Sequence, residues 1–214
     1  TDNSGTKHEG ISFLLFDMTS QGGSTKPILL ISGASPFCET FFDDVKVPKA
    51  NLMGEEGKGW SIAKYLLTHE REMISGFGHS GSKRSLGERA ADEIGLDASG
   101  RLDDTVLRQG LAQLELDVAC FGATMERVRD EAKAGQGLGA ASSIFKYYGT
   151  ELNMRRYELI MSARGEQALA WEGEAYNGGE VPRAWLRTKA NSIEGGTSEI
   201  QLNIIAKRVL GLPS

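Results

Sequence analysis

The most constraining feature of this chain is a glycine loop that leads into a helix near the end of the sequence. Residues 192–211 read SIEGGTSEIQLNIIAKRVLG, and the apolar residues after the two glycines recur at helical spacing. Ser198 and Gln201 have the spacing of a capping box, in which each side chain bonds a backbone N–H of the first turn. The pattern therefore predicts a helix that begins at Ser198 and ends near Gly211, which is placed to adopt a left-handed cap.

A loop of this kind presents free backbone N–H groups and the positive end of a helix dipole, which together can bind a phosphate or another anion. The same pattern is also typical of a tight turn before a surface helix. The loop and the cap alone therefore leave both interpretations open.

The composition is that of a soluble globular chain and argues against several function classes. Of the 214 residues, 40 % are hydrophobic and 25 % are charged, and no apolar run is long enough for a transmembrane helix. The net charge of −5 gives no support to nucleic-acid binding. Two Cys and three His are too few for a disulfide framework and argue against a zinc site. With no signal or transit pattern at the start, a reducing, cytoplasmic location of bacterial type is expected.

The hydrophobic pattern changes from strands to helices along the chain. Three apolar runs bounded by turn residues predict strands, at residues 10–17, 26–32 and 37–47. From Trp60 onward the apolar residues recur three and four apart, and further helices are predicted at residues 104–133 and 142–163. Residues 181–191 are expected to form a short helix or a turn. We expect an α+β fold, mostly α, with part of an antiparallel β domain in residues 1–54 and an up-down four-helix bundle in residues 55–214.

The run SIEGGTSEIQ resembles the C-terminal signature of the acyl-CoA dehydrogenases, I-x-E-G-T-S-x-I-Q, which precedes the last long helix of these flavoenzymes. The resemblance extends upstream over GISFLLFD, FFDDVKVP, NLMGEEGKGW and the HER of the first helix. It implies the C-terminal part of an FAD-dependent enzyme that removes two hydrogens from an acyl-CoA thioester. The family's N-terminal domain and the first part of its β domain are absent, so we expect a fragment, a processed product or one piece of a split enzyme.

The resemblance offers two positions for the catalytic carboxylate. In most family members the base is the Glu directly before G-T-S, where this chain has Gly195, and Glu194 stands one residue earlier. A subset that resembles isovaleryl- and long-chain acyl-CoA dehydrogenases has the base on the first helix of the C-terminal domain, where this chain has Glu70-Arg71. Glu70 also falls on the apolar stripe of that helix, where burial would raise its pKa toward neutrality. We expect Glu70 to be the base and Glu194 the alternative, although a structural ion pair also explains an acid on such a stripe.

The resemblance also implies a cofactor and partners. FAD is expected against the loop and the first helical turn, at Gly195, Gly196, Thr197, Ser198 and Gln201. Arg71 would orient the base or meet the CoA. Electrons would pass to an electron-transfer flavoprotein, and the bundle would form a homodimer or a homotetramer. Residues 91–101 do not match the family's Arg-x-x-Phe-Gly segment, which touches the FAD of a neighbouring subunit.

Several assignments stay open at this point. The turn at residues 176–179 could contact the flavin or be a plain loop, and Lys83 and Arg84 could meet the CoA phosphates or be solvated. Two other functions also fit the residues. One is an oxidase or a flavin monooxygenase on the same fold, and the other is a non-catalytic module that assembles through its bundle and binds no flavin.

Overall fold

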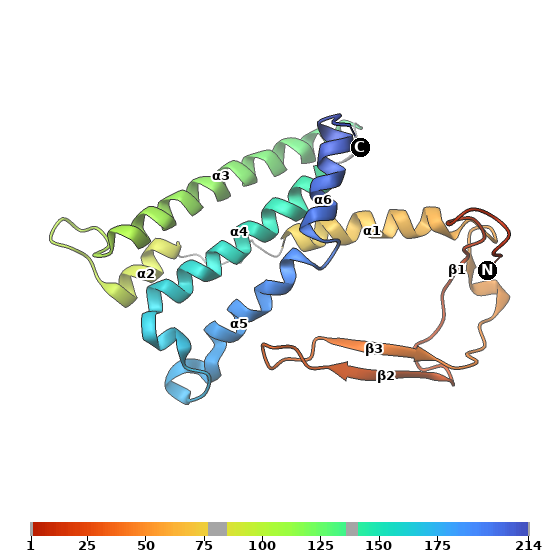
Figure 1. Ribbon diagram of the computed structural model, residues 1–214, viewed down its shortest axis with the longest axis horizontal. Coiled ribbons are helices and arrows are strands. Elements are labelled where there is room, and N and C mark those ends of the chain that lie inside the picture. The colour runs from red at the N-terminus through yellow and green to blue at the C-terminus, as the bar shows by residue number, and fades with distance from the viewer. Residues whose placement is uncertain (1, 77–84, 136–140, 214) are drawn as a thin grey trace. The chain divides into compact units, whose positions relative to one another are not determined.

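The computed structural model of the protein describes residues 2–76, 85–135 and 141–213. The chain forms two compact units, Thr1–Glu70 and Arg71–Ser214. The first contains short antiparallel strands and most of a helix, and the second is built from packed helices (Figure 1). The fold is therefore α+β and mostly α, which confirms the fold class predicted from the change in hydrophobic period.

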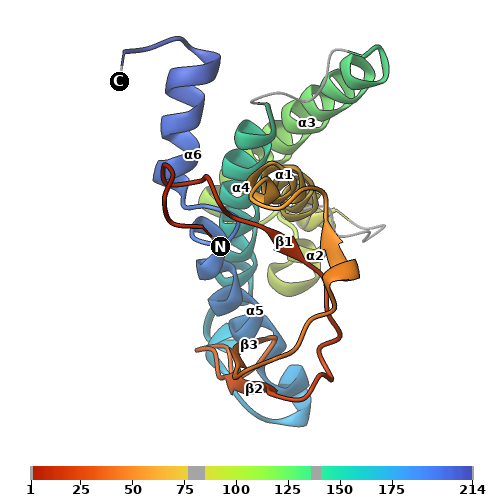
Figure 2. The same cartoon turned by 90° about the vertical axis from the view of Figure 1, so that its right-hand side faces the viewer.

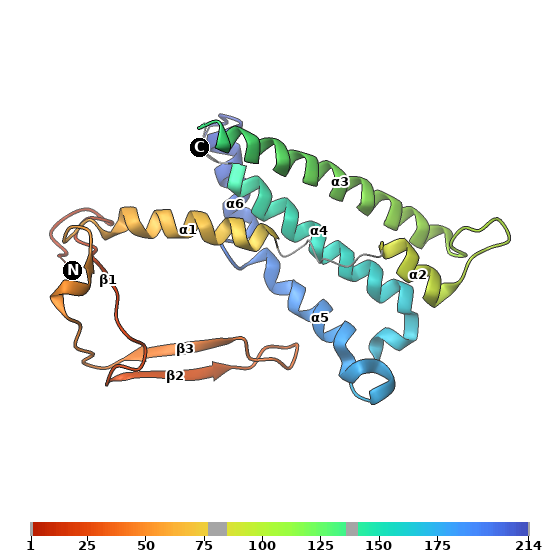
Figure 3. The same ribbon diagram turned by 180° about the vertical axis from the view of Figure 1, so that it is seen from behind.

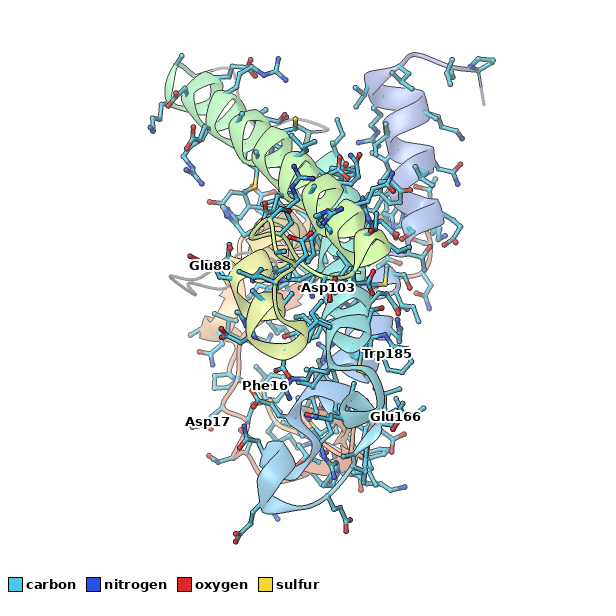
Figure 4. The ribbon with its side chains drawn as sticks, turned by 90° about the vertical axis from the view of Figure 1, so that its left-hand side faces the viewer. Phe16, Asp17, Glu88, Asp103, Glu166 and Trp185 are labelled. Carbon is cyan, nitrogen blue, oxygen red and sulfur yellow. The ribbon has the colours of Figure 1, made fainter. Side chains whose placement is uncertain are left out.

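The N-terminal unit holds two antiparallel strand pairs. β1 (Phe13–Leu14) pairs with β4 (Leu52–Met53), and β2 (Gly23–Ile28) pairs with β3 (Phe37–Phe42). The strands are shorter than predicted, and β1 does not pair with β2. A tight turn ends the first apolar run, where the carboxylate of Asp17 accepts the N–H of Thr19 at 2.8 Å (Figure 4 labels Asp17).

α1 (Gly59–Gly76) follows a short 3₁₀ turn at Lys49–Asn51. A Cβ on Gly59 would lie 2.5 Å from the backbone nitrogen of Phe13, so the start of α1 lies directly against β1. The ring of Trp60 stacks on His8 with 4.1 Å between centroids, in keeping with a packing role for this residue. Further along α1, Leu66 is 56 % exposed.

The C-terminal unit contains the remaining helices. These are α2 (Leu86–Ile94), α3 (Thr105–Lys133), α4 (Ala141–Arg164), α5 (Glu180–Thr188) and α6 (Ser198–Ile204), with 3₁₀ turns at Gly165–Leu169, Glu174–Gly179 and Lys189–Ser192 and a π-helical turn at Ile205–Val209. α3 and α4 agree with the predicted ranges to within one residue. α2 was not predicted from the sequence, although Ser85 and Glu88 form a capping box at its start (Figure 4 labels Glu88).

α4 is the central helix of this unit, because it packs against α2, α3, α5 and α6 (Figures 1–3). The main core lies between α3 and α4 and consists of Leu114, Phe121, Val128, Phe145 and Leu152. The predicted apolar seam of α3 is thus largely buried, although Val118 is 40 % exposed. Since α4 is covered on several sides, some of its polar side chains are also buried, namely those of Ser142, Ser143, Lys146 and Thr150.

Candidate functional site

The glycine loop connects the 3₁₀ turn Lys189–Ser192 to α6. The helix begins at Ser198 as predicted, but the predicted capping box between Ser198 and Gln201 is wrong. Thr197 is the N-cap instead: its backbone is extended, and its hydroxyl accepts the N–H of Ile200 at 3.3 Å. Gly211 adopts the expected left-handed conformation, with φ of +64°.

Gln201 is fully buried and holds the loop from inside. Its amide nitrogen donates to the carbonyl oxygen of Gly195 at 3.0 Å. Gly195 and Gly196 have φ of +67° and +97°, and a Cβ on Gly196 would lie 2.6 Å from the Gln201 amide nitrogen. Glycine is therefore favoured at both positions by backbone conformation, and at Gly196 by close packing as well.

The side chain of Glu194 is only 20 % exposed and has a partner on each carboxylate oxygen. Arg187 donates to Oε2 at 2.9 Å, and the amide of Asn191 donates to Oε1. Asn153 of α4 in turn donates to the side-chain oxygen of Asn191 at 2.9 Å. The network borders an open pocket of about 280 Å³, lined by Asn153, Tyr157, Ala184, Arg187, Thr188, Asn191 and Glu194.

A buried lysine supports the same loop. Lys146 of α4 has no exposed surface, and its ammonium donates to the carbonyl oxygen of Asn191 at 3.0 Å. Burial lowers the pKa of Lys146, whereas the charges of Glu194, Glu151 and Glu199 act in the opposite direction. Neither Lys146 nor the residues that bond Glu194 were predicted from the sequence.

Two buried polar atoms on the first turn of α6 suit a polar ligand. In the described part of the chain, the hydroxyl oxygen of Ser198 and the side-chain oxygen of Gln201 are buried and have no hydrogen-bond partner. A buried polar atom of this kind usually has a partner, because leaving it unsatisfied costs about 1–3 kcal/mol. A cofactor with phosphate or hydroxyl groups, such as FAD, would supply partners at a helix start approached through two glycines.

The other candidate residues lie outside this loop. Glu70 is half-buried on α1 in the N-terminal unit, whereas Glu194 belongs to the C-terminal unit, and each unit is described by itself. The side chain of Arg71, and Lys83 and Arg84 altogether, lie outside the described residues.

The glycine-rich turn at residues 176–179 is held within the C-terminal unit. Arg183 donates to the carbonyl oxygen of Gly178 at 2.9 Å, and its guanidinium lies 3.9 Å from the centre of the Trp171 ring. A Cβ on Gly179 would lie 2.3 Å from the carbonyl oxygen of Trp171. The close approach of Trp171 explains Gly179 structurally, and the flavin contact of this turn stays a prediction.

Residues 95–103 form a closed turn where the family segment was not found. The carboxylate of Asp97 accepts the backbone N–H groups of Ser99 and Arg101 at 2.8 and 3.0 Å. Leu96 and Leu102 form an antiparallel bridge across the turn. The local polar groups of this segment are thus largely satisfied among themselves.

The family model of the acyl-CoA dehydrogenase C-terminal domain matches residues 57–210. The chain belongs to the acyl-CoA dehydrogenase family. Members of this family are generally FAD-dependent, and the resemblance seen in the glycine loop is confirmed. In the described part of this acyl-CoA dehydrogenase chain, no helix is long and apolar enough to cross a membrane, and no cluster of three or more His, Cys, Asp or Glu could hold a metal ion.

Named relatives agree with this assignment. Acyl-CoA dehydrogenase FadE34 of Mycobacterium tuberculosis is 32 % identical over 218 residues, which cover 100 % of this chain and 28 % of that protein. Acyl-CoA dehydrogenase IpdE1 of Mycolicibacterium smegmatis is 30 % identical over 214 residues, which cover 100 % of this chain and 52 % of that protein. A chain of the ChsE4-ChsE5 complex from Mycobacterium tuberculosis superposes with a TM-score of 0.69 at 30 % identity, covering 96 % of this chain and 53 % of that one. The chain therefore spans about half the length of IpdE1 and less than a third of FadE34.

Proposed function

We propose that the chain is the C-terminal part of an FAD-dependent acyl-CoA dehydrogenase that oxidises an acyl-CoA thioester between its α and β carbons. The observation that carries the proposal is the fixed glycine loop, in which two buried polar atoms at the start of α6 lack partners. Residues 1–54 would then be the end of the middle β domain, and residues 55–214 the helical domain.

Glu70 is the proposed base that removes the α proton. The support comes from Glu194, the alternative candidate for the base. Arg187 and Asn191 donate hydrogen bonds to both of its carboxylate oxygens. Both oxygens of Glu194 are therefore already engaged in hydrogen bonds to the loop and α5. Glu70 instead lies half-buried on α1, directly before Arg71, which would orient it or meet the CoA. FAD, when bound, would accept the hydride from the β carbon at its N5 atom.

The loop residues have binding roles in this proposal. Gly195 and Gly196 let the backbone approach the cofactor, since neither carries a Cβ. Ser198 offers its buried hydroxyl, while Thr197 fixes the start of α6 through its cap. Gln201 keeps the loop in place through Gly195 and leaves its side-chain oxygen for a further bond.

Assembly and electron transfer are proposed on the same basis. The bundle would form a dimer or a tetramer, either of identical chains or with a second acyl-CoA dehydrogenase chain, as the name of the ChsE4-ChsE5 complex suggests. An electron-transfer flavoprotein would accept the electrons, in a cytoplasmic location.

The test begins with the protein purified from its source together with any polypeptide bound to it. We expect a yellow solution whose flavin absorbance is bleached anaerobically by an acyl-CoA. Glu70→Gln should slow bleaching about 10²–10⁴-fold, the usual contribution of a general base. Glu194→Gln should stay within about tenfold of the wild type, because its carboxylate bonds residues of the loop and α5. Loss of bleaching only in the Glu194 variant would reverse the assignment.

Two further outcomes separate the alternatives. Oxygen consumption without an added electron acceptor would favour an oxidase or a monooxygenase on the same fold. A colourless protein that still forms a stable oligomer, and that takes up no added FAD, would favour a non-catalytic assembly module.

A further inference from the structure

The buried ammonium of Lys146 is the one charged group of the C-terminal unit's described residues that has no exposed surface at all. Its nitrogen has a single hydrogen-bond partner there, the backbone carbonyl of Asn191 at 3.0 Å. The ammonium also feels the charges of Glu194, Glu151 and Glu199. In the described part of the chain, however, none of these carboxylates comes within 4.0 Å of the Lys146 nitrogen to form a salt bridge, and Glu194 pairs with Arg187 instead.

Such an arrangement does not favour stability. Removing an ammonium from water is costly, and the cost is offset only by a close opposite charge or by several hydrogen bonds. Lys146 has three donors and one partner. An apolar side chain of similar length would fill the same space without this desolvation cost, so packing alone does not explain a lysine at this position.

The contact of Lys146 has a specific location. Asn191 is the residue whose amide bonds Glu194, and four residues later the carbonyl of Gly195 accepts the amide of Gln201. Lys146 and Gln201 are both fully buried, and each bonds a backbone carbonyl of the segment 191–195. Two backbone carbonyls at and before the glycine loop are therefore held from inside the unit, that of Asn191 by Lys146 of α4 and that of Gly195 by Gln201 of α6.

We propose that Lys146 is a positioning residue for the flavin loop, whose ammonium fixes the carbonyl of Asn191 and thereby orders Gly195 and Gly196 for cofactor binding. This inference rests on the proposed function. A positioning role can be distinguished from a general structural role by measurement. The order of the loop, and not the stability of the whole C-terminal unit, should depend on Lys146.

The experiment uses three variants in the protein purified with the polypeptides that accompany it. Lys146→Met removes the donor and the charge but keeps a long side chain. Lys146→Gln keeps a donor without the charge. Lys133→Met is the matched control, because Lys133 is 70 % exposed near the end of α3 and, among the described residues, pairs only with Asp130. Backbone hydrogen exchange is measured by mass spectrometry after removal of flavin, and the dissociation constant of FAD is then measured by titration.

For Lys146→Met we expect exchange in residues 191–198 to be at least tenfold faster, with the α3–α4 core and the thermal midpoint unchanged or the midpoint raised. FAD should bind at least tenfold more weakly, while kcat at saturating FAD stays within about threefold, since Lys146 does not touch the substrate in this proposal. Lys146→Gln should recover part of the protection, and Lys133→Met should match the wild type.

Two results would overturn the inference. Loop exchange and FAD affinity within twofold of the wild type in both Lys146 variants would show that the ammonium does not order the loop. Faster exchange throughout the C-terminal unit together with a lower midpoint would show a general structural role. If the wild-type protein binds no FAD, the proposed function fails, whereas loop exchange still decides the role of Lys146. If Lys146→Met does not fold, loop exchange and FAD affinity are compared between Lys146→Gln and the wild type instead.

Discussion

Gly196→Ala is the substitution that the geometry of the glycine loop constrains most. Gly196 has φ of +97°, where a residue with a Cβ costs about 1–2 kcal/mol. The new Cβ would lie 2.6 Å from the amide nitrogen of Gln201, which is fully buried and cannot turn toward water. Displacing this amide would break its bond to the Gly195 carbonyl, and an unsatisfied buried group costs about a further 1–3 kcal/mol. We therefore expect a loss of about 2–5 kcal/mol in the free energy of unfolding.

The assay is urea unfolding followed by circular dichroism, with Gly100→Ala as the matched control. Gly100 has φ of +77°, and a Cβ there would meet nothing within 4 Å. Gly100→Ala should therefore show only the backbone cost of about 1–2 kcal/mol. The difference between the two variants isolates the contact with Gln201.

A double-mutant cycle tests this contact directly. In a Gln201→Ala background the cost of Gly196→Ala should fall to about 1–2 kcal/mol, because the displaced amide is gone. If the two substitutions are instead additive within about 0.5 kcal/mol, the contact between Gly196 and Gln201 does not carry the cost and the reasoning fails.

Two further predictions concern the bundle. Leu114→Ala removes a side chain that is 2 % exposed at the centre of the α3–α4 core, so urea unfolding should show a loss of about 2–5 kcal/mol, whereas truncation of the exposed Leu116 on the same helix should change little. Arg155 donates to Asp117 at 2.8 Å, and this hydrogen bond holds the pKa of Asp117 below its usual 3.8. The contribution of Asp117 to stability is therefore present above pH 3.8 and is lost as the pH falls through the lower pKa of the folded state. The unfolding free energies of the wild type and of Asp117→Asn should converge in acid. If the difference between them is unchanged from pH 7 to pH 3, the ion pair with Arg155 does not contribute as described.

The long helices were predictable because their signals are local. The apolar residues of α3 recur three and four apart from Leu107 to Val128, and Asp104 supplies a cap at the predicted start. The strand pairing was not predictable in the same way. Nothing in the run at residues 10–17 shows that β1 pairs with a strand almost forty residues later, since pairing depends on chain segments that meet only in the folded unit.

In the candidate site, too, the local features were predictable from the sequence and the long-range contacts were not. The glycine loop and the start of α6 follow from the letters GGTS, although Thr197 and not Ser198 caps the helix. The support of the loop by Lys146 follows from the packing of α4 on several sides and is invisible to a search for one apolar stripe. A signal was available nonetheless: Ser143, Gly149 and Thr150 form a second face of small residues around Lys146, and such a face allows close packing of neighbouring elements.

The conformation of the loop bears on where the base can be. Gly195, which the resemblance aligns with the family's usual base position, has φ of +67°, and its carbonyl accepts a hydrogen bond from Gln201. A Glu at this position would carry a backbone cost of about 1–2 kcal/mol in a segment that cannot readily relax. Glu194 has no such strain, but Arg187 and Asn191 engage both of its oxygens. Gly195 carries no carboxylate and both oxygens of Glu194 are engaged, which supports the proposed base outside the loop, at Glu70.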